Sequence, residues 1–260
     1  METAFDIGMY DGADTRYYLE LGYRVLAVEA NPNLIAMAKK SFAGYIQRGA
    51  LELLGIAVGT SGGTLDLTVC GADLGASSIF ADRIAERFPI GVHKVPSRSL
   101  MDLIAQYGKP KFIKIDIEGA DKMCVMSLTK DSAPQYLSFE AHSDIEEMIR
   151  HAQSIGYEGF KIINQCNFLS LQRQHRLSDR VARKLIGIMG YGEPLLVRRA
   201  GRFFRAEHSA GPAPWESDGG WHTADNVLAA WNRAKRTGRT FGWYDVHASL
   251  GESPRQPGKR

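Results

Sequence analysis

Two glycines and two carboxylates near the start of the chain have the types and spacing of a cofactor-binding turn. Gly8 and Gly12 follow an apolar run at residues 4–7, Asp6 lies inside that run, and Glu29 closes the next apolar run. Glycines let a ligand approach the backbone, and the N-terminus of the following helix favours an anionic group. Asp6 could receive a ligand ammonium group. Glu29 lies about 20 residues beyond the first glycine, where an acid binds ribose hydroxyls.

The spacing of the glycines distinguishes between cofactors. A dinucleotide fingerprint has the pattern G-x-G-x-x-G, whereas three residues separate Gly8 from Gly12. The wider spacing suits a smaller cofactor and disfavours a nucleotide-dependent oxidoreductase. An ordinary strand-to-helix turn would explain the glycines alone, so the interpretation depends on Glu29.

A second group of polar residues interrupts an apolar run. In the segment KFIKIDIEGAD, residues 111–121, period-two alternation places Lys114, Asp116 and Glu118 on one face near the carboxyl end of a strand. Unpaired buried charges cost several kcal/mol, so these side chains should pair with one another, with a metal or with a substrate. The alternative is a purely structural ion pair of Lys114 with Glu118 or Glu140.

The next apolar run ends near Glu140 and His142, which could reach the same pocket. Asp116, Glu118 and His142 are therefore the candidate catalytic residues, acting as a base or as substrate anchors. A lone histidine is also often a hydrogen-bonded core residue. This oxygen-rich set could hold Mg²⁺, but spacing does not establish such a site and we expect no metal.

Apolar runs alternate with helical patterns, which predicts an α/β fold with a doubly wound, mostly parallel sheet. In such a sheet, ligands bind beyond the carboxyl ends of the strands, where both groups of candidate residues would lie. Strands are expected at 4–7, 24–29, 51–58, 62–69, 111–117, 136–140 and 160–163, and helices at 14–21, 32–42, 81–88, 100–107, 145–155 and 224–236.

We expect one domain at residues 1–209, an extension at 210–251 that packs on it, and a disordered tail at 252–260. The extension begins with a segment rich in Gly, Pro and Ser, and it is too aromatic to be free disorder. Four of its residues could form a lid over substrate, a dimer contact or ordinary core packing: Trp243, Tyr244, Asp245 and His247.

The composition of the 260 residues is typical of a soluble globular protein, with 44% hydrophobic and 23% charged residues. Apolar runs stay short of the roughly 18 to 20 residues that cross a bilayer, and without a secretory signal we expect a cytoplasmic protein. Three widely spaced cysteines are expected to be buried free thiols. The net charge of +3, concentrated at 173–205 and 233–239, fits solvated helix faces or an acidic substrate.

Together these segments resemble the FkbM-type family of S-adenosylmethionine-dependent methyltransferases. The matching segments occur in the order of the family: FDIGMYDGADT, VLAVEANP, GIAVGTSGGTLDL, GASSIF, SLMDLI, FIKIDIEGAD and LSFEAH. FIKIDIEGAD is the most specific of them, and the resemblance covers about residues 5 to 165. It implies a class I methyltransferase (Rossmann-like) fold and S-adenosylmethionine as the cofactor. The implied contacts are Asp6, Gly8, Tyr10, Gly12, Glu29, Ala30, Ile56, Ala57 and Asp116.

One departure concerns Met9 and Tyr10, which stand where the family usually has Ala-Asn, so that the Tyr10 backbone amide would replace a side-chain contact. The resulting hypothesis is O-methylation of a hydroxyl on a small molecule, sugar or glycan. A non-catalytic binding module that retains the fold is the alternative. We expect neither nucleic acid nor a membrane as a partner, and a homo-oligomer is compatible with the sequence.

Overall fold

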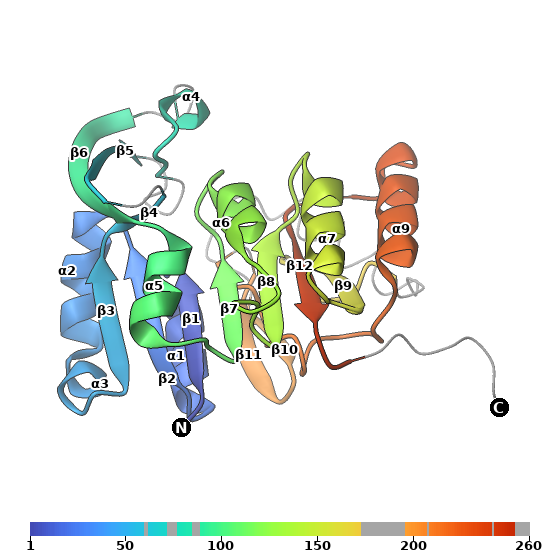
Figure 1. The fold of residues 1–260 in the computed structure, drawn as a ribbon, viewed down its shortest axis with the longest axis horizontal. Helices are drawn as coiled ribbons and strands as arrows, with labels where there is room; N and C mark the ends of the chain where they lie inside the picture. Colours follow the sequence, from blue (N-terminus) through green and yellow to red (C-terminus); the bar gives the residue numbers. More distant parts are fainter. Residues whose placement is uncertain are drawn as a thin grey trace. The chain divides into compact units, whose positions relative to one another are not determined.

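The computed structural model describes residues 1–59, 62–71, 77–84, 89–172, 196–206, 208–240 and 242–252. The chain forms two compact units, Met1–Phe139 and Glu140–Arg260 (Figure 1). Three predictions fall wholly or partly outside the described residues: the helix beyond Ile84, most of the basic run at 173–205, and the tail from 253.

A parallel sheet forms the centre of the first unit. Its strands run in the order β3 (Leu51–Gly55), β2 (Arg24–Glu29), β1 (Thr3–Ile7), β7 (Phe112–Ile115) and β8 (Tyr136–Glu140), and each neighbouring pair is parallel. Most side chains of β1, β2 and β7 are buried, which explains the nearly continuous apolar runs in the sequence. The predicted α/β fold with a mostly parallel sheet is confirmed.

The strand order reverses beside β1. From β1 the chain adds β2 and β3 on one side, and later β7 and β8 on the other side. The carboxyl ends of β1 and β7 therefore border a topological switch point, where open α/β sheets bind ligands. Both predicted motifs lead to this place.

Two helices of the first unit begin at side-chain caps. α2 (Pro32–Ser41) begins after Asn31, whose side chain accepts a hydrogen bond from the Asn33 N–H. α5 (Leu100–Tyr107) begins with a capping box between Ser99 and Asp102. The other helices of this unit are α1 (Ala13–Glu20), α3 (Ala43–Gln47), α4 (Ala81–Ile84) and α6 (Asp121–Ser127).

A separate three-stranded sheet has the order β4 (Ala57–Val58), β6 (Pro89–Arg98) and β5 (Thr64–Cys70). The strand predicted at 51–58 is therefore divided, because Ile56 separates β3 from β4 and the two enter different sheets. β6 was not predicted. Its first six residues are all exposed, so the strand lacks the alternation of apolar and polar residues that marks a half-buried strand.

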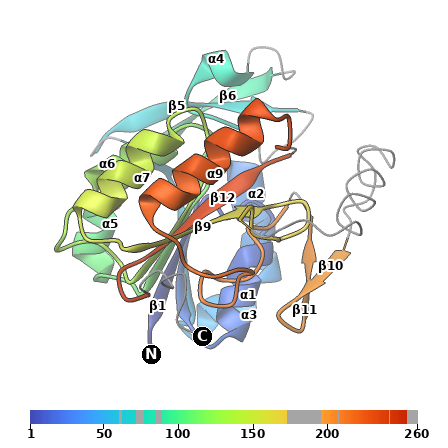
Figure 2. The same cartoon turned by 90° about the vertical axis from the view of Figure 1, so that its right-hand side faces the viewer.

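The second unit contains α7 (Ile145–Ser154), β9 (Gly159–Asn164), α9 (Ala224–Arg236) and β12 (Tyr244–Ser249). β12 pairs antiparallel with β9, and all six of its residues are buried. The two helices lie side by side, joined by an ion pair of 2.7 Å between Arg150 Nη1 and Asp225 Oδ1 (Figure 2). Because the segment expected to be an extension supplies β12, the chain divides near residue 140 rather than near 210.

Burial differs among the four C-terminal residues for which a lid, a dimer contact or core packing was considered. Tyr244, Asp245 and His247 are buried within the second unit, as core packing requires, whereas Trp243 is 40% exposed. The expected buried free thiols are confirmed at Cys70, Cys124 and Cys166. Among the helices described, none has the length and apolarity needed to cross a membrane.

Candidate functional site

An open pocket of about 470 Å³, its mouth included, lies in the first unit. Six of the residues predicted to contact a cofactor line it: Gly8, Glu29, Ala30, Ile56, Ala57 and Asp116. The lining also includes residues that the sequence analysis did not single out, among them Val28, Val58, Leu67, Ser77, Ser78, Ile79, Ile117 and Ala120. Motifs far apart in the sequence thus meet around one cavity.

Gly8 follows β1 and lies against Asp116, the residue that follows β7. Its φ is +88°, and a Cβ atom added there would lie 1.8 Å from the carbonyl oxygen of Asp116. The N–H groups of Gly8 and Met9 both donate to the carbonyl of Val28, at 2.9 and 3.0 Å. Position 8 therefore requires a residue without a side chain, because its backbone lies between the ends of β1, β2 and β7.

Gly12 packs against Phe42 at the start of α1. Its φ is +81°, and an added Cβ would lie 2.6 Å from the ring of Phe42. Gly12 precedes α1 and is absent from the pocket lining. The packing of the helix start on Phe42 therefore accounts for a glycine at this position.

Glu29 connects the two loops beside the pocket. Its carboxylate accepts hydrogen bonds from the backbone N–H groups of Tyr10, at 3.1 Å, and Asn31, at 2.8 Å. Tyr10 has a φ of +50°, in the left-handed region that residues other than glycine seldom adopt. Burial raises the pKa of Glu29 to about 7, although these backbone hydrogen bonds act in the opposite direction.

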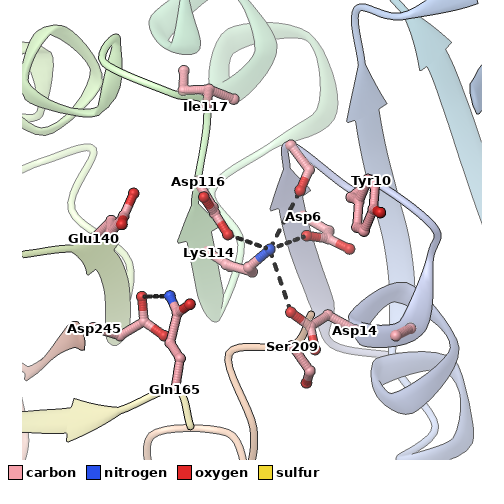
Figure 3. A network of polar contacts seen from close by, with 12 residues as sticks. Asp6, Tyr10, Asp14, Lys114, Asp116, Ile117, Glu140, Gln165, Ser209 and Asp245 are labelled. Carbon is pink, nitrogen blue, oxygen red and sulfur yellow. Dashed lines mark hydrogen bonds and ion pairs between the residues drawn. The ribbon is translucent and has the colours of Figure 1, made fainter. Parts of the chain in front are cut away.

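Lys114 is at the centre of a cluster of carboxylates (Figure 3). Its Nζ lies 3.3 Å from Asp14 Oδ2, 3.4 Å from Asp116 Oδ2 and 3.6 Å from Asp6 Oδ1. It also donates to the carbonyl of Gly8, at 3.3 Å. Lys114 therefore forms ion pairs with Asp6, Asp14 and Asp116, whereas Glu118 or Glu140 was the expected partner of a structural ion pair.

Asp6 and Asp116 occupy different positions in this cluster. Asp6 is fully buried and accepts a hydrogen bond from Thr15 Oγ1 at 2.5 Å, so it lies beneath the pocket rather than in its wall. Burial raises the pKa of Asp6 to about 6, against the opposing effect of Lys114. The Asp116 side chain is 32% exposed and lines the pocket. Of the two, only Asp116 could touch a ligand.

Glu118 is not on the strand where period two had placed it. β7 ends at Ile115, and Glu118 has a φ of +45° in the turn that follows. Its carbonyl accepts a hydrogen bond from Ser78 Oγ at 2.7 Å. Asp121 accepts from the N–H groups of Ile117 and Gly119, which stabilises this turn. The predicted common face of three side chains is wrong beyond Asp116, because the backbone changes direction.

His142 belongs to the second unit. Its Nε2 lies 2.9 Å from Oε2 of Glu140, which is 5% exposed. In the parts of the chain that the structure describes, no group of three His, Cys, Asp or Glu side chains is placed to hold a metal ion. Of the three predicted catalytic residues, Asp116 is the one that lines the pocket of the first unit.

The family model described as the methyltransferase FkbM domain matches residues 6–165. The methyltransferase FkbM from Methylobacillus flagellatus KT is 16% identical over 63% of this chain, with a TM-score of 0.44, and the match spans 40% of that protein. No curated protein matches the chain significantly.

Two other solved structures are similar to the chain. The precorrin-6y C5,15-methyltransferase from Geobacter metallireducens GS-15 is 9% identical, with 95% of this chain and 79% of that one covered and a TM-score of 0.41. The TehB-like SAM-dependent methyltransferase from Corynebacterium glutamicum ATCC 13032 Kitasato is 11% identical, with coverages of 62% and 68% and a TM-score of 0.32.

Proposed function

Because the chain belongs to the FkbM methyltransferase domain family, we propose that it transfers the methyl group of S-adenosylmethionine to a hydroxyl of a sugar, glycan or small metabolite. The observation that carries the proposal is the position of Asp116. Its carboxylate lines the pocket and lies 3.4 Å from Lys114, while its backbone lies directly against Gly8. A carboxylate at the switch point is placed to receive a proton.

The cofactor would occupy the side of the pocket formed by β2 and the loop after β3. The Glu29 carboxylate would accept hydrogen bonds from the ribose hydroxyls. Ile56 and Ala57 would lie along the adenine, where apolar side chains suit a flat ring. When bound, S-adenosylmethionine supplies an electrophilic methyl group on a sulfonium.

The protein has two tasks in such a transfer. The acceptor oxygen must lie in line with the breaking carbon–sulfur bond, and this positioning supplies most of the rate enhancement. As the new carbon–oxygen bond forms, the hydroxyl proton must leave, and in this proposal it moves to the Asp116 carboxylate. A placed base typically contributes about 10²- to 10⁴-fold.

The test combines cofactor binding with turnover. Asp116→Asn should bind S-adenosylhomocysteine in calorimetry, and it should transfer labelled methyl groups about 100-fold more slowly to any accepted sugar, glycan or hydroxylated metabolite. His142→Ala tests a second candidate base. Asp66→Asn is the matched control, because Asp66 is an exposed carboxylate of the same unit, paired with Lys94.

Three outcomes would count against the proposal. If Asp116→Asn and His142→Ala both transferred methyl groups at the wild-type rate, neither side chain would be the base. Cofactor binding without methyl transfer to any acceptor would favour the non-catalytic binding module. Binding of NAD(H) in place of S-adenosylmethionine would favour the oxidoreductase, which the glycine spacing disfavours.

The raised pKa of Glu29 predicts a pH-dependent cofactor affinity. Ribose hydroxyls donate to the ionised carboxylate, so binding must release the proton that Glu29 carries below its pKa of about 7. Affinity for S-adenosylhomocysteine should therefore fall about tenfold from about pH 8 to about pH 6. Glu29→Gln should bind more weakly at about pH 8 and should lose this dependence. A slope that persists in Glu29→Gln would assign the titration to another group.

A further inference from the structure

A short hairpin of the second unit has an unusual outer face. β10 (Leu196–Arg199) and β11 (Arg202–Arg205) pair antiparallel across a two-residue turn (Figure 2). Ala200 and Gly201 of that turn have φ values of +45° and +79°. Two successive positive φ angles are typical of the tight turn whose twist matches that of paired strands, and such a turn defines the register of the hairpin.

The register separates the side chains into two faces. Phe204, on the inner face, is buried and its ring centroid lies 5.6 Å from that of Phe168, which attaches the hairpin to its unit. The outer face, called here the hairpin face, consists of Leu196, Arg198, Phe203 and Arg205. All four are exposed, Leu196 by 59% and Phe203 by 67%.

Charged and apolar side chains alternate on the hairpin face. Leu196 lies opposite Arg205, and Arg198 lies opposite Phe203. The two arginines are therefore diagonal neighbours, about 7–8 Å apart at their Cα atoms, and so are the two apolar residues. Like charges at this spacing repel each other, and an anion bound by both relieves the repulsion.

We propose that the hairpin face docks on an anionic lipid membrane surface. Residues 196–206 contain four arginines and no acidic residue, which complements lipid phosphates. Phe203 and Leu196 can enter the boundary between headgroups and acyl chains, as apolar side chains do in interfacial binding. Arginine and phenylalanine alone would also suit single-stranded nucleic acid, but Leu196 has no ring on which a base could stack.

The composition gave no reason to expect a membrane partner, because four arginines and two apolar residues are ordinary in number. Pairing between the strands is what gathers two of these arginines, Arg198 and Arg205, with Leu196 and Phe203 on one face. Such a contact is peripheral, since the hairpin is far too short to span a bilayer.

Cosedimentation of the full chain with vesicles tests the proposal. Vesicles of phosphatidylcholine and phosphatidylglycerol, mixed roughly two to one, should bind the protein. Vesicles of phosphatidylcholine alone should bind it at least about tenfold more weakly. Arg198→Ala with Arg205→Ala should weaken binding to the anionic vesicles about tenfold. Leu196→Ser with Phe203→Ser should weaken it by a similar factor.

Matched controls come from exposed residues elsewhere in the chain. Met37→Ser removes an apolar side chain that is also 59% exposed, and Arg236→Ala removes an exposed arginine. Both should leave vesicle binding unchanged, and circular dichroism should show all variants folded. Equal binding to neutral vesicles would overturn the proposal. So would binding of a single-stranded oligonucleotide that needs Phe203 but not Leu196, without binding to vesicles.

Discussion

Replacing Lys114 with methionine should destabilise the protein by about 3 to 5 kcal/mol. Lys114 is the buried cation within 3.6 Å of Asp6, Asp14 and Asp116, and two of these carboxylates are themselves buried. Methionine has a similar volume, so the substitution removes the charge and leaves no large cavity. The carboxylates would then repel one another in a medium that solvates them poorly.

The pH dependence of this penalty has a definite sign. Burial raises the pKa of Asp6 to about 6 even though Lys114 lowers it. A carboxyl whose pKa is raised on folding contributes stability below about pH 4, and this contribution is lost as the pH rises through the folded-state pKa. Without Lys114 the pKa of Asp6 rises further, so the loss extends to higher pH. The penalty of Lys114→Met should therefore grow from acid to neutral pH.

Urea denaturation at several pH values measures both effects. Lys111→Met is the matched control, because Lys111 precedes the same strand and pairs with Glu2 at 2.8 Å near the surface. Its ion pair is partly exposed, so the control should cost less than about 1 kcal/mol and should show little pH dependence. Equal free energies of unfolding for the two variants would mean that the carboxylate cluster does not depend on Lys114.

Much of the first unit could be predicted from its sequence because its strands are buried. Arg24–Glu29 and Tyr136–Glu140 are apolar runs bounded by polar or turn residues, and the structure begins and ends both strands as predicted. Strand β6 was not predicted, because its exposed first six residues show no alternation of apolar and polar side chains. Local signals therefore sufficed only where burial imposed the pattern.

The partners of Lys114 could not be predicted from the residues around it in the sequence. Asp14 belongs to a helix about 100 residues earlier in the chain, and the parallel pairing of β1 with β7 is what brings it near Lys114. The turn at Glu118 escaped prediction for a related reason, because its direction depends on hydrogen bonds to Ser78 and Asp121. Both errors come from contacts that form only in the folded unit.

Gly8→Ala, which adds one methyl group in the pocket, should greatly reduce both the stability of the protein and its affinity for the cofactor. The added Cβ would lie 1.8 Å from the Asp116 carbonyl oxygen and 2.8 Å from its carbon, so the ends of β1 and β7 would have to separate. We expect a destabilisation of more than about 4 kcal/mol. Cofactor binding should also be lost, because Gly8 and Asp116 form adjoining parts of the pocket wall.

Gly22→Ala separates the crowding at Gly8 from the backbone conformation. Gly22 has the same φ of +88°, but an added Cβ there would meet no atom within 4 Å. The control therefore bears only the cost of a left-handed alanine, about 1 to 2 kcal/mol, and should bind S-adenosylhomocysteine normally. Thermal denaturation and calorimetry of both variants measure the difference. If the two glycines tolerated alanine equally, β1 and β7 would not need their close approach, and the pocket would not depend on it.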